Sequence, residues 1–298
     1  MATSIRVSAT VSAARERAFR HPLAVLARLA RNRAAVAGFM MLVVMALAAT
    51  LAGALVPYGA DTADLNSVLQ PPSAAHLFGT DQLGRDILAR IVYGGRISLL
   101  IGVLAVAVGA AIGVPLGVVS GFYGGRTDAL IQRAVDVMLS FPGFLLALTL
   151  ISLLGVGPRN VVLSVGIASV PVYVRLVRAV TLSVRELAYV ESARAIGLSD
   201  VRIMFRHVLP NTAAPIIVQS SLQLGVALLT AAGLGFLGIG VTPPTPEWGT
   251  MLGEAQTYIL SAWYMGTFPG LAIFAAVMAF NLLGDGLRDA LDPRMKTV

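Results

Sequence analysis

Long stretches without a single charged residue constrain this chain more than any other feature. Three of them cover residues 34–56, 97–122 and 137–157, and a shorter one covers 160–174. A helix needs about 20 apolar residues to cross a hydrocarbon core of about 30 Å. Because a segment in lipid must satisfy its own backbone hydrogen bonds, we expect these four runs to be transmembrane helices. The fourth is expected to continue through two arginines that can reach the interface, Arg175 and Arg178.

Two further apolar runs lie toward the C-terminus. Residues 212–246 carry no charge but end in the helix-hostile sequence GVTPPTP, so we predict one span followed by an external loop. Residues 255–284 form the last run, with membrane entry expected near Pro269. Only 12% of the residues are charged, against roughly 25% in soluble domains. The sequence therefore predicts an all-α integral membrane protein with about six transmembrane helices.

The distribution of basic residues predicts the orientation. If both termini lie in the cytoplasm, 18 of the 22 lysines and arginines are cytoplasmic, and Arg85, Arg90, Arg96 and Arg159 lie outside. This asymmetry follows the positive-inside rule and requires an even number of spans. We therefore expect a multi-pass membrane protein that contacts the lipid bilayer and no nucleic acid.

The expected layout follows from these assignments. It comprises a cytoplasmic segment 1–33, a first helix 34–56, an external loop with a short helix 57–96, a five-helix core 97–284 that includes a cytoplasmic loop 179–211, and a cytoplasmic tail 285–298.

The cytoplasmic loop is too long and too patterned for a simple turn. No helix breaker occurs over residues 185–196, and Gly197 is placed to end that helix. Ser199 can cap a second short helix, which Pro210 would close before the fifth span. From spacing alone, an interfacial amphipathic connector without a partner explains the loop equally well.

A motif within this loop resembles a known signature. The residues concerned are Glu191, Ser192, Ala193, Gly197, His207, Leu209 and Pro210. They resemble the cytoplasmic EAA signature of permeases in binding-protein-dependent ABC importers: E-A-A, three residues, G, nine residues, then I-x-L-P. The spacing is kept in full, while Ser192 replaces an alanine and His207 replaces an isoleucine. The resemblance implies that loop 186–210 is a coupling helix that docks on an ATPase subunit.

Two other stretches are similar to the "C" type of dipeptide and oligopeptide permease. They are LFGTDQLGRDILARIVYGGRISLLIG at 77–102 and NLLGDGLRDALDPR at 281–294. The similarity extends over most of the chain from about Leu77 onward. It implies the type I importer (MetI-like) permease architecture and, as substrates, dipeptides or oligopeptides. Nickel chelates and glutathione, imported by related proteins, remain alternatives.

The first of these stretches also has an interpretation from its residues alone. Thr80 or Asp81 can cap a short outer helix that contains Arg85, Asp86 and Arg90. Asp86 and Arg90 are four residues apart and can pair. This helix serves either as a structural entry to the second span or as a contact for the external binding protein or the substrate.

The resemblance also implies a location in the bacterial inner membrane and a set of partners. They are a homologous permease in a heterodimer, two cytoplasmic ATPase subunits that hold ATP and Mg, and an external substrate-binding protein. In this picture the two permeases rock between inward-open and outward-open states.

Several other chemistries are disfavoured by the sequence. No G-x-x-x-x-G-K-[ST] motif occurs, and Lys296 is the only lysine. The chain therefore lacks a phosphate-cradling loop, is not expected to be an enzyme, and is expected to bind no cofactor itself. A metal site is not expected either, because cysteine is absent and the three histidines are scattered. A stand-alone carrier or channel without an ATPase is the alternative from another class; an intramembrane enzyme would need catalytic groups that the spans lack.

Glycine motifs in the spans have a structural and a functional interpretation. Gly233, Gly235 and Gly238 spell G-x-G-x-x-G, but inside an expected membrane helix they favour close helix packing over dinucleotide binding. Residues 102–117 are rich in small side chains at four-residue spacing, which also favours helix packing. Lining of a translocation pathway is the alternative for this stretch.

Overall fold

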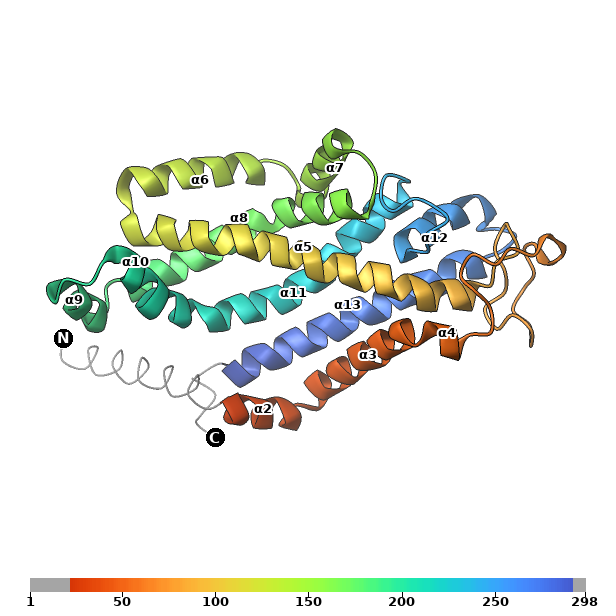
Figure 1. Cartoon of the computed structure of the whole chain (residues 1–298), viewed down its shortest axis with the longest axis horizontal. Helices are drawn as coiled ribbons and strands as arrows, with labels where there is room; N and C mark the ends of the chain where they lie inside the picture. Colours follow the sequence, from red (N-terminus) through yellow and green to blue (C-terminus); the bar gives the residue numbers. More distant parts are fainter. Residues whose placement is uncertain (1–21, 292–298) are drawn as a thin grey trace.

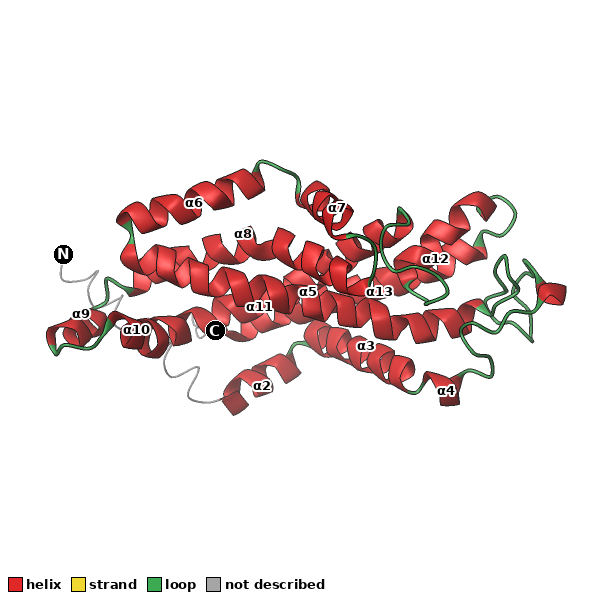
Figure 2. Cartoon of the chain, turned by 45° about the horizontal axis from the view of Figure 1, so that its top comes forward, coloured by secondary structure: helices red, strands yellow, loops and turns green. Residues whose placement is uncertain are grey.

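The structure, a computed structural model, describes residues 22–291, and the account below concerns these residues. Their regular secondary structure is helical, joined by loops, and one isolated antiparallel bridge links Thr80 and Asp86 (Figure 2). The elements in chain order are α2 (Pro22–Arg31), α3 (Arg33–Thr50), α4 (Ala52–Leu55), η1 (Leu65–Ser67), α5 (Ile87–Tyr123), α6 (Gly125–Leu139), α7 (Gly143–Leu154), α8 (Pro158–Val184), α9 (Ala188–Ala195), α10 (Asp200–Ile203), η2 (Met204–Val208), α11 (Leu209–Phe236), α12 (Trp248–Ala255), η3 (Gln256–Tyr258) and α13 (Tyr264–Leu291).

The long helices lie side by side along one axis (Figure 1). Helix α11 packs against α5, α8 and α13, while α3 packs against α13 and α5. One end of the bundle carries α9 and α10, and the other carries α4, α12 and the loop before α5 (Figure 1). Five helices are long and apolar enough to cross a membrane, and a bent pair makes up to six. The predicted all-helical membrane architecture with about six spans is confirmed.

The buried core follows two sides of α11. On one side, Leu228 packs in a cluster with Trp248 and Met265. On the other, Leu234 packs in a cluster with Ile101 and Val165. Because both faces of α11 are covered by protein, this helix joins the α12–α13 half of the bundle to the α5–α8 half.

Glycines on α5 allow α8 to approach closely. A Cβ on Gly113 would lie 2.5 Å from Cβ of Tyr173, and one on Gly117 would lie 2.8 Å from the carbonyl oxygen of Val174. Gly109 and Gly121, four residues before and after this pair, are equally crowded by α8. The small residues predicted to pack helices do so here, since backbone-to-backbone contact leaves no room for a side chain.

The third span differs from its prediction as a straight helix over 137–157. Helix α6 ends at Leu139, α7 begins at Gly143, and the two are bent by 90°. Pro142 lies at the break, and a proline removes a backbone donor and disfavours helical geometry in the residue before it. At about 1.5 Å per residue, α7 alone is too short to cross the hydrocarbon core. This span is therefore formed by a bent pair.

Three further helix boundaries can be compared with their predictions. Helix α11 ends at Phe236 and a loop follows to Glu247, which confirms one helix followed by a loop in this run. Helix α13 begins at Tyr264, so Pro269, the predicted point of membrane entry, lies inside the helix. The predicted short helix within 57–96 is not separate from the second span, because α5 already begins at Ile87.

Candidate functional site

The patterned loop forms a distinct projection at one end of the bundle, where α9 and α10 extend beyond the long helices (Figure 1). Its inner face is anchored by the buried apolar residues Val190, Ile203 and Val208, which pack in a cluster with Val118 and Phe122 of α5. The projection is thus fastened to α5 by apolar contacts while its other face stays open.

Gly197 ends α9 as the sequence predicts. Its φ is +79°, a left-handed conformation that favours glycine. The N–H of Leu198 donates to the carbonyl of Ala193 at 3.1 Å, and the N–H of Gly197 donates to that of Arg194 at 2.9 Å. These two bonds make a Schellman motif, which satisfies carbonyl groups that the helix end would leave unpaired. The result is a tight reversal between α9 and α10, with nothing within 4 Å of a Cβ on Gly197.

The three residues of the E-A-A part lie on α9, on opposite faces. Ala193 is buried against the bundle, whereas Glu191 and Ser192 are exposed. The Ser192 hydroxyl donates to the carbonyl of Ala188 at 2.8 Å, so its hydrogen is already bonded within the helix. The small residue at 193 permits close packing beneath the loop, and the carboxylate at 191 remains available at the surface.

The end of the loop differs from the sequence expectation. His207, Leu209 and Pro210 do not close a short helix, because α10 continues through η2 into α11. Segment η2 is π-helical, and the N–H of Leu209 donates to the carbonyl of Met204, five residues back. Pro210 directly follows this π-helical turn as the second residue of α11, so its missing N–H falls where the helix is already widened. The loop is therefore joined to the fifth span by continuous helix.

Ser199 occupies the predicted N-cap position but makes no side-chain capping bond. Helix α10 begins instead with the backbone bond from the N–H of Ile203 to the carbonyl of Ser199, at 3.0 Å. The predicted position is right, and the predicted capping bond is absent.

Three large apolar side chains on this projection are exposed, and the sequence reasoning missed them. Ile196 is 77% exposed, Phe205 67% and Val201 57%. They flank the Gly197 reversal on both sides. An exposed apolar group beside free charges is typical of a protein–protein contact. A usable signal in the sequence was their apolar character within a loop expected to lie outside the membrane.

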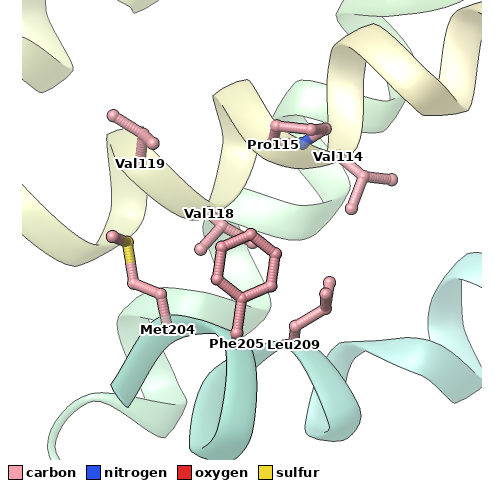
Figure 3. Close-up of a pocket in the computed structure, with 7 residues that line it drawn as sticks. All are labelled: Val114, Pro115, Val118, Val119, Met204, Phe205 and Leu209. Carbon is pink, nitrogen blue, oxygen red and sulfur yellow. The ribbon is translucent and has the colours of Figure 1, made fainter. Parts of the chain in front are cut away.

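An apolar cavity of about 100 Å³ separates the base of this projection from α5 (Figure 3). It is lined by Val114, Pro115, Val118, Val119, Met204, Phe205 and Leu209. Pro115 removes one internal hydrogen bond of α5, and the π-helical turn faces it across the cavity. Two irregular helix segments therefore meet at a loosely packed contact.

A closed cluster of charges lies at the opposite end of the bundle. Oδ2 of Asp81 accepts hydrogen bonds from Nε of Arg85 at 2.6 Å and from Nη1 of Arg90 at 2.5 Å. Nη1 of Arg90 also donates to Glu254 of α12 at 2.7 Å. Asp81, Arg85 and Arg90 are all at most 3% exposed. The cluster ties the loop before α5, the start of α5 and α12 into one unit.

Asp86 has a different partner from the one predicted. It caps α5, because its carboxylate accepts from the N–H of Ala89 at 2.7 Å, and it lies 2.9 Å from Nδ1 of His76. Neither Thr80 nor Asp81 is the cap. The predicted Asp86–Arg90 pair is wrong, since Arg90 turns to Asp81 and Glu254. The helix start at Ile87 places Asp86 at its cap, where its carboxylate bonds the backbone.

Glu254 was missed by the sequence reasoning. Glu247 and Glu254 are the only charged residues between Thr212 and Gly284, which was a usable signal. Glu247 is buried and caps α12, accepting from the N–H groups of Gly249 and Thr250 at 3.0 and 2.8 Å. Glu254 completes the outer charge cluster, which consists of Asp81, Arg85, Arg90 and Glu254.

The G-x-G-x-x-G motif has a structural role. Gly233 lies against the ring of Phe144, and Gly235 lies against Glu247 and the start of α12. Gly238 has a φ of +76° in the turn after α11.

Among residues 22–291, no group of three potential metal ligands comes together.

Comparison with protein families agrees with this fold. Residues 113–297 match the model of the binding-protein-dependent transport system inner membrane component. Residues 12–72 match the N-terminal TM domain of oligopeptide transport permease C.

Individual proteins show the same relationship. The chain is 47% identical to the glutathione transport system permease protein GsiD of Pectobacterium atrosepticum, over 91% of this chain and 90% of that protein. It is 45% identical to the dipeptide transport system permease protein DppC of Alkalihalophilus pseudofirmus, over 91% and 89%. It is also 45% identical to the di/tripeptide transport system permease protein DppC of Pseudomonas aeruginosa, over 90% of each chain.

Solved structures agree at the level of the fold. A chain of the MetNI methionine ABC transporter in an inward-facing conformation superposes with a TM-score of 0.59 at 17% identity, covering 69% of this chain and 98% of that chain. The chain therefore belongs to the inner-membrane components of binding-protein-dependent transport systems, as a permease of the dipeptide/oligopeptide type.

Proposed function

We propose that this chain is one of two homologous permease subunits in an ATP-driven importer of short peptides. It pairs with the second permease as a heterodimer, receives substrate from an external binding protein, and is driven by two cytoplasmic ATPase subunits that hold ATP and Mg. The chain itself hydrolyses nothing and binds no cofactor. Both its termini and loop 186–210 lie in the cytoplasm.

The observation that carries this proposal is the open face of the projection around Gly197. Ile196 and Val201 are exposed there, whereas Val190 and Ile203 attach the other face to α5. An apolar ridge of this kind fits a groove on a second protein. Glu191 lies exposed on the same projection and can pair with a basic group of that partner.

The continuous helix from α10 through η2 into α11 supports coupling. A push on the projection reaches the fifth span without crossing a flexible linker, because Pro210 does not interrupt the helix. The apolar cavity between η2 and α5 leaves space for small movements at this joint (Figure 3). We propose that ATP-driven closure of the ATPase pair moves the loop and thereby tilts α11.

The assignment of short peptides as substrates rests on relatives. Relatives named for dipeptide and di/tripeptide transport share 45% identity over about nine-tenths of this chain. Relatives named for glutathione transport share up to 47%. Glutathione is itself a small peptide, so it is the second candidate substrate. A nickel chelate is the third candidate substrate.

Substitution at Gly197 tests the coupling role. We expect Gly197→Glu to abolish co-purification of the ATPase subunits and peptide uptake, because it puts bulk and a charge at the reversal. The space around the Cβ is open, so the structural cost is that of a left-handed backbone, about 1–2 kcal/mol, and the chain should still insert and fold. Gly197→Asn is the matched control, because asparagine tolerates the left-handed conformation without adding charge.

The proposal fails if the detergent-extracted complex contains no ATPase, or if Gly197→Glu leaves uptake intact. The substrate is tested separately in a strain that lacks this gene. Uptake of a radiolabelled dipeptide, of glutathione and of a nickel chelate is compared with and without the restored gene. Restoration of nickel uptake alone would overturn the peptide assignment while leaving the coupling proposal standing.

A further inference from the structure

Helices α5 and α8 are in close contact along only part of their length. Between Gly109 and Gly121 the backbones touch, because each glycine faces α8 directly. Gly102, nearer the start of α5, faces the carbonyl of Leu224 on α11 instead. Toward the end of the bundle that carries α12, side chains such as Ile101 and Val161 join the two helices in place of glycine contacts, so the backbones lie further apart there.

A groove of about 230 Å³ opens where they separate. It is lined by Ile97, Leu100, Ile101 and Leu104 of α5 and by Pro158, Arg159, Val162 and Leu163 of α8. The four α5 residues follow the i, i+3, i+4, i+7 spacing of one helix face. Leu100 and Leu104 are 53% and 43% exposed, so the groove is open to the surroundings. Its wall is aliphatic apart from one arginine.

Arg159 differs from the other three arginines on the proposed outer side. Arg85 and Arg90 pair with Asp81. Arg96 donates to the carbonyl groups of Ala49 and Thr50. Arg159 has neither a hydrogen bond nor an ion pair with any residue of the described range 22–291. It is the second residue of α8, so its charge lies at the end of the groove nearest the helix start.

We propose that this groove binds a phospholipid of the outer leaflet, with one acyl chain between α5 and α8 and the phosphodiester at Arg159. The aliphatic wall matches an acyl chain, and the unpaired guanidinium matches an anionic phosphate, which it can hold with two parallel hydrogen bonds. Long arginine side chains lay their stem along apolar surface and place the charge at the interface. An apolar helix of the partner permease fits less well, because it would cover Arg159 without a counter-charge.

The proposed consequence concerns the separated half of the helix pair. An acyl chain between α5 and α8 fills a gap that would otherwise leave apolar side chains without contacts. The lipid would thus support this end of the pair in the separated arrangement. The choice of leaflet rests on the orientation proposed above, whereas the groove and its free arginine do not.

Photolabelling of the intact transporter tests the site. The complex of both permeases and the ATPase subunits is reconstituted with a phosphatidylglycerol that carries a diazirine in one acyl chain, and labelled peptides are mapped by mass spectrometry. We expect labelling of residues 97–104 and 158–163 above that of the exposed α3 face. Arg159→Gln should lower the groove labelling about five-fold, as expected for loss of one cation–phosphate contact of about 1 kcal/mol. Arg159→Lys should restore most of it.

Arg126→Gln is the matched control, because Arg126 is also an exposed second residue of a helix, α6. It should leave the labelling unchanged. Leu104→Phe partly fills the groove and should lower labelling without touching the charge.

Groove labelling equal to that of α3, or unchanged in Arg159→Gln, would overturn the proposal. Absence of groove labelling in the intact complex would also overturn it and would indicate that the partner permease covers the groove. None of these readouts depends on uptake, so a failure here is distinct from a failure of the transport proposal.

Discussion

The two ends of the bundle differ in which side chains they bury and which they expose. At the α12 end, Asp81, Arg85 and Arg90 are buried and balanced by each other and by Glu254. At the α9–α10 end, charges stay in solvent and Ile196 is 77% exposed. A buried charge needs its partner within the same fold, while an exposed apolar group gains from a partner outside it. The charges of the first end are therefore balanced within this chain, although Nε and Nη2 of Arg90 are buried there without a hydrogen bond, and the second end exposes apolar side chains that could contact another protein.

Removing one carboxylate from the closed end should have the largest effect on folding. Asp81→Asn leaves Arg85 and Arg90 with one counter-charge between them, and we expect the free energy of unfolding to fall by about 3–5 kcal/mol. The measurement is the thermal unfolding midpoint of the purified complex, together with the amount of chain in the membrane. Asp136→Asn is the control, since its pair with Arg175 is 56% exposed on both sides and should be worth about 0–1 kcal/mol. Equal effects of the two substitutions would show that the outer cluster is not a closed unit.

A methyl group between α5 and α8 should have the next largest effect. Gly113→Ala would place its Cβ 2.5 Å from Cβ of Tyr173 and 2.8 Å from the carbonyl oxygen of Val170. We expect a loss of about 1–3 kcal/mol through forced separation of the helices. Gly143→Ala serves as control, because nothing lies within 4 Å of a Cβ at that position. A Gly113→Ala variant as stable as Gly143→Ala would mean that the close approach of the two helices is not needed.

A substitution at the α9–α10 end should weaken association with the ATPase subunits and leave the stability of the fold unchanged. Ile196→Asp should change the free energy of unfolding by no more than about 0.5 kcal/mol, because the side chain is already exposed. The affinity for the ATPase subunits, measured by co-purification, should fall at least about tenfold, since burial of an isoleucine is worth about 1.5–3 kcal/mol. Leu65→Asp tests the contrast at the other end, where an apolar side chain is 76% exposed. If both substitutions reduce ATPase recovery equally, the projection is not a specific contact.

The smallest effect is expected at the unbonded cap of α10. Ser199→Ala should leave stability within about 0.5 kcal/mol of the parent, because the hydroxyl makes no capping bond. Asn32→Ala should cost about 0.5–2 kcal/mol, since its side-chain oxygen accepts from the N–H groups of Ala34 and Ala35. The two unfolding midpoints can be compared directly in one detergent. A larger loss for Ser199→Ala would indicate that α10 is held by its side-chain cap after all.

Local patterns predicted the elements whose causes are local. The apolar runs gave the long helices, since a membrane span depends on length and composition. The glycine at 197 predicted the end of α9, since only the local backbone conformation is involved. Prediction was less reliable for the exact positions at which helices begin and end. The cap of α5 is Asp86 and not Thr80 or Asp81, and Pro210 does not end a helix because η2 widens the turn before it.

The sequence by itself determined that this protein lies in a lipid bilayer. It also determined the approximate number of spans and the position of the loop that resembles a coupling segment. These follow from run length, glycine placement and residue spacing along the chain. The tertiary structure alone decided that Arg90 pairs with Asp81 and Glu254, and that Ile196 and Phe205 remain uncovered. Pairing and exposure depend on which distant segments meet, and Glu254 is 164 residues away from Arg90 in the chain. No periodicity within a single helix encodes such a meeting.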